Sequence, residues 1–319
     1  MEKKSRDQFS QFEKEVFDGL SASPKYLSSK FFYDETGDEI FRQIMDLPQY
    51  YPTKSEFEII KNHAADFGEN FSSPDGLDLF ELGSGDGIKT KYILKQLLRQ
   101  NEDFIYYPTD ISRHSLKGLK ITIGKELPEL KVKPFEGTYH KTLAHISNFN
   151  RRKKVIIMLG SNIGNLLHRE AIEFLRSIRR VMSKGDMLLM GFDQKKDPSV
   201  ILAAYNDPQG VTEQFNKNLL LRINREMGAD FNTEQFLHWP LYDPETGTAK
   251  SFLLSKIRQQ VKIPSIGLTA EFSKWETIHT EISQKYDDAV IEWLAKESGL
   301  KIFTSYSDEK EYYKNFIFI

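Results

Sequence analysis

The chain has 319 residues, a length that suits one large domain or two intertwined domains. Hydrophobic residues make up 39% and charged residues 28%, so a sizeable core can be buried, and a formal net charge of −2 argues against nucleic acid as a partner. The absence of cysteine excludes disulfides, thiolate zinc sites and cysteine nucleophiles. The charged N-terminus has no apolar segment, and the apolar runs are far shorter than the roughly 20 residues of a membrane span, so we expect a cytoplasmic protein without a membrane partner.

The first part of the chain is predicted to be helical. Apolar residues recur with a helical period from Phe9 to Phe17. The helices expected here are Arg6–Leu20, Asp38–Leu47 and Ser55–Phe67. Two loops rich in aromatic residues separate them, Phe31–Asp34 and Pro48–Thr53.

The middle of the chain alternates strands with helices. Continuous apolar runs of strand length, separated by amphipathic helices, are typical of a parallel sheet covered on both faces. The predicted strands are Leu77–Leu82, Phe104–Pro108, Lys131–Phe135, Lys154–Leu159 and Asp186–Phe192. The predicted helices between them are Lys89–Leu98, Ser112–Leu127 and Arg169–Met182.

From Asp197 to about Gln284 this alternation stops. A long helix, Val211–Met227, precedes runs that resemble antiparallel strands of a second lobe: Gln235–Pro240, Ala249–Ile257, Gln260–Ile263 and Ala270–Ile282. The alternation then returns with a helix and two closing strands: Asp288–Glu297, Lys301–Tyr306 and Tyr313–Ile319.

The order of these elements predicts an α/β protein with a doubly wound seven-stranded sheet that ends in an antiparallel hairpin. This plan resembles that of the class I methyltransferases, and a dinucleotide dehydrogenase has no reason to end in this way. We expect residues 60–195 with 287–319 to form the cofactor domain. Residues 1–59 with 196–286 are expected to form an α+β substrate lobe.

A glycine-rich loop follows the first predicted strand. Glycines alternate at Gly83, Gly85 and Gly87, so the backbone can turn tightly and a ligand can approach it closely. Ile88 breaks the Gly-Lys-Thr order of a phosphate-binding P-loop, and the spacing differs from the G-x-G-x-x-G of dinucleotide sites. The loop does match the methyltransferase pattern of an acidic residue, here Glu81, followed by G-x-G-x-G. A plain tight turn remains the alternative.

Asp110 ends the second predicted strand. A carboxylate at that position can accept two hydrogen bonds from a ribose diol. It could also cap the helix that follows Ser112, or serve a dinucleotide. Asp110 alone therefore does not separate the cofactor hypotheses.

Longer segments resemble the ergothioneine-pathway histidine Nα-methyltransferases, whose relatives include fungal enzymes that methylate a prenylated tryptophan. They extend over nearly the whole chain in matching order. The segments are Ser29–Asp34, Leu47–Thr53, Glu81–Gly85, Leu159–Leu166, Tyr205–Thr212, Phe215–Asn216, Ile223–Glu226 and Ala229–Phe231.

The resemblance implies S-adenosylmethionine as cofactor and a free amino acid, bound between the two lobes, as substrate. It assigns Tyr33 and Asn165 to the amine as catalytic residues. It assigns the substrate carboxylate to Asn165 together with Tyr205. It assigns the substrate side chain to Tyr50, Glu281 and Ser283. The cofactor residues that it implies are Glu81, Gly83, Gly85, Lys89, Asp110, Thr138, Tyr139 and Gly160.

Some positions depart from the family pattern. Thr138 stands where an acidic residue would grip adenine, and Ser251 stands where the histidine enzymes place a methionine against the substrate. The first hypothesis is therefore an amino-acid Nα-methyltransferase that accepts L-histidine, and the second is the same reaction on another amino acid or amine. A nicotinamide-dependent oxidoreductase and a non-catalytic protein that binds S-adenosylmethionine are the alternatives from other classes. We expect no metal site, because the histidines lie apart in sequence. We also expect a monomer.

Overall fold

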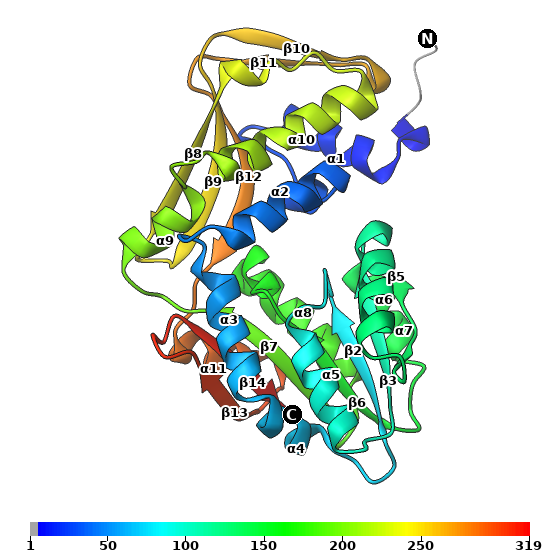
Figure 1. Cartoon of the computed structure of the whole chain (residues 1–319). Coiled ribbons are helices and arrows are strands. Elements are labelled where there is room, and N and C mark those ends of the chain that lie inside the picture. Colours follow the sequence, from blue (N-terminus) through cyan, green and yellow to red (C-terminus); the bar gives the residue numbers. More distant parts are fainter. Residues whose placement is uncertain (1–5) are drawn as a thin grey trace. The chain divides into compact units, whose positions relative to one another are not determined.

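The structure is a computed structural model that describes residues 6–319, and its chain divides into two compact units (Figure 1). One unit contains the described residues up to Tyr50 together with Asp197–Ser283, and the other contains Tyr51–Lys196 with Gln284–Ile319. Residues 51–59, 196 and 284–286 were expected in the substrate lobe but belong to the second unit, where residues 51–59 open a helix. That helix packs against the last strand of this unit's sheet.

The second unit is built on a mixed sheet with the strand order β13-β14-β7-β6-β2-β3-β4, and β5 also pairs with β3. Strands β2 to β7 run parallel, and β14 is antiparallel to both β7 and β13. This order confirms the doubly wound sheet with a closing hairpin. The strands are β2 (Leu77–Leu82), β3 (Phe104–Asp110), β4 (Lys131–Val132), β5 (Phe135–Glu136), β6 (Lys153–Met158), β7 (Met187–Asp193), β13 (Ile302–Ser307) and β14 (Tyr313–Phe318).

The third predicted strand is divided into β4 and β5. The Lys133 N–H still donates to the Tyr106 carbonyl oxygen of β3, at 2.8 Å. Alternate residues face a neighbouring strand, so the ladder next requires the N–H of residue 108 in β3, and Pro108 has none. The single strand expected over Lys131–Phe135 is therefore two short strands along the same edge.

Helices cover both faces of this sheet (Figure 1). The predicted helix Ser55–Phe67 begins earlier, at Tyr51, and is interrupted at His63, while α7 was not predicted. The helices of this unit are α3 (Tyr51–Asn62), α4 (Ala64–Phe71), α5 (Thr90–Arg99), α6 (Arg113–Glu126), α7 (Tyr139–Ile146), the short 3-10 helix η3 (Asn162–Asn165), α8 (His168–Val181) and α11 (Asp288–Ser298).

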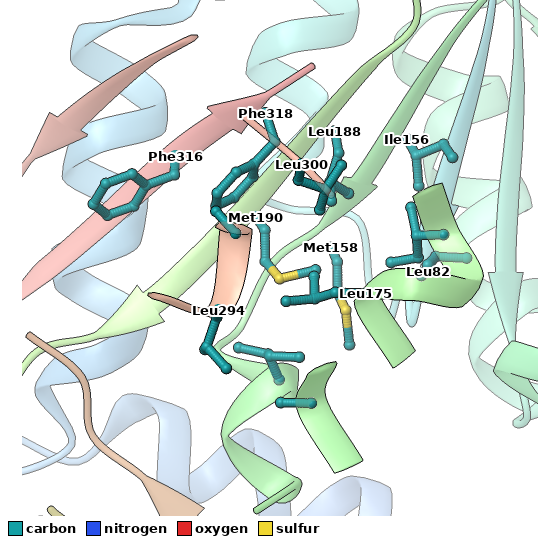
Figure 2. Close-up of a cluster of buried hydrophobic side chains, with 14 of the residues drawn as sticks. Leu82, Ile156, Met158, Leu175, Leu188, Met190, Leu294, Leu300, Phe316 and Phe318 are labelled. Carbon is teal, nitrogen blue, oxygen red and sulfur yellow. The ribbon is translucent and has the colours of Figure 1, made fainter. Parts of the chain in front are cut away.

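Two hydrophobic cores flank the sheet because side chains alternate along each strand. In β2, Leu77 and Leu79 belong to the core beneath α3 to α6. Phe80 and Leu82 belong to the core on the opposite face, where Figure 2 shows side chains of α8 and α11 against those of β6, β7 and β14. With both faces filled, the carboxyl ends of the parallel strands are where this sheet can bind a ligand.

The other unit combines a four-stranded sheet, in the order β1-β12-β9-β8, with a two-stranded hairpin of β10 and β11. Its helix α10 packs on α2 and against β8 and β9, and Leu219, Leu220 and Ile223 of α10 are buried in its core. The helices are η1 (Arg6–Gln8), α1 (Gln11–Ser21), η2 (Ser29–Phe32), α2 (Glu35–Asp46), α9 (Pro198–Tyr205), α10 (Val211–Met227), η4 (Thr233–Gln235) and η5 (Pro264–Ile266). The strands are β1 (Lys25–Tyr26), β8 (Phe236–Asp243), β9 (Thr248–Ser255), β10 (Gln259–Ile263), β11 (Leu268–Phe272) and β12 (Thr277–Gln284).

One prediction in this unit was wrong in detail, and one strand was not predicted. The strand expected over Ala270–Ile282 is two strands, because the chain turns between β11 and β12, where Trp275 has a φ of 69°. Strand β1 was not expected, and it pairs in parallel with β12. Within residues 6–319 there is no helix with the length and apolar character to cross a membrane, and no group of three or more His, Asp or Glu side chains suited to a metal ion.

Candidate active site

The glycine loop after β2 has the backbone shape that the sequence suggested. Gly83 and Gly85 have φ values of 71° and 52°, in the left-handed region that other residues rarely adopt. A Cβ added to Gly83 would lie 3.3 Å from both the Tyr139 hydroxyl and the Asn162 Nδ2. The missing side chain thus leaves a narrow space between the loop and these two polar groups.

Asp110, at the end of β3, is joined to this loop. Its carboxylate accepts from the Gly85 N–H at 3.0 Å and from the Ser112 N–H at 2.9 Å. Burial raises the pKa of Asp110, and the backbone hydrogen bonds oppose that rise. Each carboxylate oxygen still has a second lone pair, so Asp110 can hold the loop and accept from a diol.

Tyr139 and Thr138 come next along the sheet edge, at the start of α7. The half-buried Tyr139 ring packs on Phe174, with ring centroids 5.2 Å apart, and burial raises the pKa of its hydroxyl. Thr138 is exposed and is the N-cap residue of α7, but its side chain makes no capping hydrogen bond. The structure therefore brings Tyr139 to the glycine loop and leaves the Thr138 side chain at the surface.

Glu81 lies inside the protein, beneath the loop. Its carboxylate is buried and is hydrogen-bonded to the Thr90 hydroxyl and the Tyr106 hydroxyl. Burial raises the pKa of Glu81 to about 7, and these two hydrogen bonds oppose the rise. Glu81 therefore supports the loop from inside the protein, which differs from the cofactor contact that the resemblance implied. The reason is that its side chain lies on the same face of β2 as Leu77 and Leu79.

Lys89 and Gly160 lie close together, although they follow different strands. A Cβ added to Gly160, whose φ is 77°, would lie 3.7 Å from the Lys89 ammonium and 3.6 Å from the Asn162 Nδ2. Both residues contact Glu56, which forms an ion pair with Lys89 and accepts from the Gly160 N–H at 2.7 Å. Glu56 was not predicted from the sequence. The available signal for Glu56 was an acidic residue on the face of α3 that carries the buried Ile59 and Ile60.

Asn165 is the last residue of η3, and it is exposed. The backbone beneath it is held in place by the Tyr286 hydroxyl, which donates to the Ile163 carbonyl oxygen at 3.1 Å. Gly164 is needed there, because an added Cβ would lie 2.9 Å from the Gln284 carbonyl oxygen. Asn165 is thus presented to solvent on a fixed turn at the carboxyl end of β6.

The other predicted substrate residues belong to the smaller unit. Tyr33 and Tyr50 both make edge-on contacts with Phe41, at centroid distances of 5.5 and 6.2 Å. Tyr205 is the last residue of α9 and is buried. The structure therefore brings Tyr33 and Tyr50 together around Phe41, and it places Tyr205 on a different element of the same unit.

Glu281 and Ser283 lie two residues apart on β12 and so share a face of the sheet. Ser251, fully buried on β9, donates a hydrogen bond from its hydroxyl to Glu281 Oε2 at 3.1 Å. A carboxylate and a hydroxyl side by side can bind two polar nitrogens of one ligand. Ser251 therefore forms one polar cluster with Glu281.

The residues around the glycine loop fit S-adenosylmethionine. Ser84 Oγ is buried and has no hydrogen-bond partner among residues 6–319, so the loop holds a polar atom that a ligand could satisfy. Asp110 can receive the ribose diol, Tyr139 can lie against adenine, and Lys89 can meet the methionine carboxylate. This site, on a sheet that ends in an antiparallel hairpin, defines a class I S-adenosylmethionine-dependent methyltransferase.

Comparison with known proteins specifies the family. The model of the histidine-specific, S-adenosylmethionine-dependent methyltransferases matches residues 12–318, and the chain belongs to this family. The histidine N-alpha-methyltransferase of Mycobacterium tuberculosis is 34% identical over 296 residues, which cover 93% of this chain and 91% of that protein. Ergothioneine biosynthesis protein 1 of Schizosaccharomyces pombe is 27% identical over 91% of this chain and 38% of that protein. An L-tryptophan methyltransferase of Psilocybe serbica is 26% identical over 93% of this chain and 90% of that protein.

Replacing Asp110 with alanine is expected to weaken binding of S-adenosylhomocysteine by about 5- to 150-fold, the equivalent of roughly 1–3 kcal/mol. The change removes the acceptor for the ribose diol and the bond that holds Gly85. Isothermal titration calorimetry measures the effect. Asp103→Ala, at the exposed opposite end of β3, is the matched control and should bind as the unaltered protein does. Equal affinity in the two variants would remove Asp110 from the cofactor site.

Proposed function

We propose that this methyltransferase acts on the α-nitrogen of L-histidine and adds up to three methyl groups, giving trimethylhistidine (hercynine). The observation that carries the proposal is the match of residues 12–318 to a histidine-specific family. The named activity of the Mycobacterium tuberculosis relative supports the same substrate. The product is the one expected of an enzyme in ergothioneine biosynthesis, as the name of the Schizosaccharomyces pombe relative suggests.

In this proposal the chain's own residues orient an amine for in-line attack on the methyl group, which the sulfonium of S-adenosylmethionine supplies. Alignment and exclusion of water provide most of the rate enhancement in such a displacement. The amine must lose its proton before its lone pair can attack. Tyr33 can accept a hydrogen bond from the amine and offer its ring to the cation that forms as methyl groups accumulate. Asn165 has both a donor and an acceptor, so it can contact the amine and the carboxylate.

The side-chain specificity is assigned to β12. Glu281 and Ser283 can each hydrogen-bond one imidazole nitrogen, while Tyr50 lines the same pocket and Tyr205 binds the substrate carboxylate together with Asn165. The hydrogen bond from Ser251 supports this assignment, because it restrains the Glu281 carboxylate. A carboxylate acceptor favours a ring that carries an N–H over a purely apolar side chain.

The second candidate is the same reaction on another amino acid with an aromatic or polar side chain. The observation in its favour is the small, buried Ser251, a hydroxyl at the position where the resemblance puts a methionine. The Psilocybe serbica relative, named for L-tryptophan, illustrates that members similar to this chain differ in substrate. Parallel assays with the other amino acids separate the two candidates.

Incubation with L-histidine and S-adenosylmethionine is expected to give mono-, di- and trimethylated histidine in sequence, with every methyl group on the α-nitrogen. Liquid chromatography with fragment-resolved mass spectrometry locates the methyl groups. Methylation of a ring nitrogen would reverse the assigned orientation of the substrate. Turnover of a different amino acid without turnover of histidine would retain the reaction and discard the substrate.

The setting of the enzyme is also part of the proposal. We infer a cytoplasmic monomer that requires neither nucleic acid nor a membrane; the formal net charge of −2 supports the lack of a nucleic-acid partner. The unit of residues 51–196 with 284–319 would bind the cofactor, and the other unit would supply most substrate contacts. Light scattering after size-exclusion chromatography tests the monomer.

A further inference from the structure

We propose that Glu56 is a positioning residue of the cofactor site, which holds Lys89 and the Gly160 peptide in the geometry that the methionine end of the cofactor requires. Glu56 does not belong to the glycine loop, and it precedes that loop by more than a full helix in sequence. The inference rests on the assignment of S-adenosylmethionine as cofactor. Glu56 would join that site as the residue that orients Lys89 and Gly160.

The first observation is the burial of Glu56. Its side chain is 0% exposed, although it is ionisable. It lies among the buried residues of α3, which include Ile59 and Ile60. Burial of a carboxylate costs free energy unless charged and hydrogen-bonded partners compensate for it. A buried acid in α3 therefore needs a specific set of partners.

The second observation is the nature of those partners. Glu56 Oε2 accepts from the Gly160 N–H at 2.7 Å and also pairs with the Lys89 ammonium, while Oε1 accepts from Asn315 Nδ2 at 3.1 Å. All three partners are donors, so both oxygens must be acceptors. A carboxylate meets that requirement on both oxygens, whereas a glutamine amide would remove the charge opposite Lys89 and leave only one oxygen for the Lys89 ammonium, the Gly160 N–H and the Asn315 amide.

The third observation is the space made for the carboxylate. A Cβ added to Gly191 of β7 would lie 2.2 Å from Glu56 Oε1 and 2.4 Å from the Tyr313 hydroxyl. The absence of a side chain at Gly191 thus allows Glu56 to cross the carboxyl end of the sheet. Because it does so, one side chain reaches residues that follow β2 and β6 and a residue within β14.

The consequence concerns the direction of Lys89. The Lys89 side chain is 20% exposed, so it is held at Glu56 and is still accessible to a ligand. A free lysine would spread its ammonium over many rotamers, and ordering it on binding would reduce affinity. Glu56 removes that cost in advance, and it also holds the Gly160 peptide beside the Lys89 ammonium.

The experiment compares Glu56→Gln with Glu58→Gln, the same chemical change at a half-buried carboxylate of the same helix that accepts from the Glu309 N–H rather than from Lys89 or Gly160. Isothermal titration with S-adenosylhomocysteine is expected to show binding weakened about tenfold or more by Glu56→Gln and unchanged by Glu58→Gln. Titration of Lys89→Met and of the double variant completes a double-mutant cycle. If Glu56 acts through Lys89, the double variant will bind only slightly more weakly than Lys89→Met alone.

A thermal unfolding scan of each variant separates positioning from folding. Titrations are made well below the lowest midpoint, and Glu56→Asp provides a second variant that keeps the charge and moves it by one methylene group. Affinity within about twofold of the unaltered protein for both Glu56 variants, or fully additive effects in the cycle, would overturn the proposal. A failure of the unaltered protein itself to bind S-adenosylhomocysteine would instead refute the cofactor assignment, so the two failures are distinguishable.

Discussion

Replacing Asp193 with asparagine is expected to lower the free energy of unfolding by about 3–5 kcal/mol. Asp193 ends β7 and is buried, and it pairs with Lys196 at 2.5 Å and with Lys285 at 2.8 Å. The Tyr51 hydroxyl donates to the same carboxylate at 2.9 Å. Lys196 and Lys285 have side chains that are 5% and 1% exposed, so the variant would leave two buried ammonium groups without a counter-charge.

The pH dependence of this loss gives a second readout. Burial raises the pKa of Asp193, but the Lys285 and Lys196 ammonium groups outweigh it and hold that pKa below the usual value. Burial also lowers the pKa of Lys196 to about 8, so the folded protein binds this proton less tightly than the unfolded chain, and stability gains from Lys196 as the pH rises above about 8. Without the carboxylate the lysine pKa should fall further. The variant then gains stability between its own lower lysine pKa and about 8, a range in which the unaltered protein does not, so we expect the deficit to be largest at mildly acidic pH and to shrink as the pH rises to about 8.

Urea unfolding followed by circular dichroism at about pH 6 and about pH 9 measures the deficit on either side of this range. Asp288→Asn is the matched control, because Asp288 forms an ion pair with Lys314 while its side chain is 56% exposed. Breaking an exposed pair should cost less than about 1 kcal/mol. A deficit for Asp193→Asn no larger than that of the control would show that the lysines rearrange without cost.

Replacing Asn165 with alanine is expected to reduce kcat/KM for L-histidine by about 10²- to 10³-fold, which would make it the most damaging change among the substrate residues. The proposed role of Asn165 is to contact both the amine and the carboxylate of the amino acid, so one substitution removes two hydrogen bonds to charged groups. Its turn is anchored by Tyr286 and packed at Gly164, so loss of the exposed side chain should leave the backbone unchanged.

Initial rates by mass spectrometry, together with titration of S-adenosylhomocysteine, test this expectation. The cofactor affinity of Asn165→Ala should stay within about twofold of the unaltered enzyme, and Asn148→Ala, in an exposed turn after α7, should retain full activity. Glu281→Ala should chiefly raise the KM for histidine. If Asn165→Ala keeps most of its activity, the amine and carboxylate are held by other residues.

Much of the cofactor site could be predicted from the sequence because its chemistry is local. Gly83 and Gly85 directly follow an apolar strand, and Asp110 ends the next one, so spacing alone places them at the same edge of a parallel sheet. The closing hairpin was equally readable, since two strand-length runs flank a short polar connection. The division of the third strand was not foreseen, although Pro108 was visible, because the sequence does not show which neighbouring strand requires the missing N–H.

The sequence by itself determined the strand and helix alternation, the glycine loop and the position of Asp110, because periodicity and backbone freedom are properties of neighbouring residues. The tertiary structure decided the rest. It turned Glu81 inward to Thr90 and Tyr106, and it brought Glu56 to Lys89 and Gly160. Whether a carboxylate supports a loop, positions a lysine or contacts a ligand depends on the donors that folding brings to it, and those donors come from strands and helices far apart in the chain.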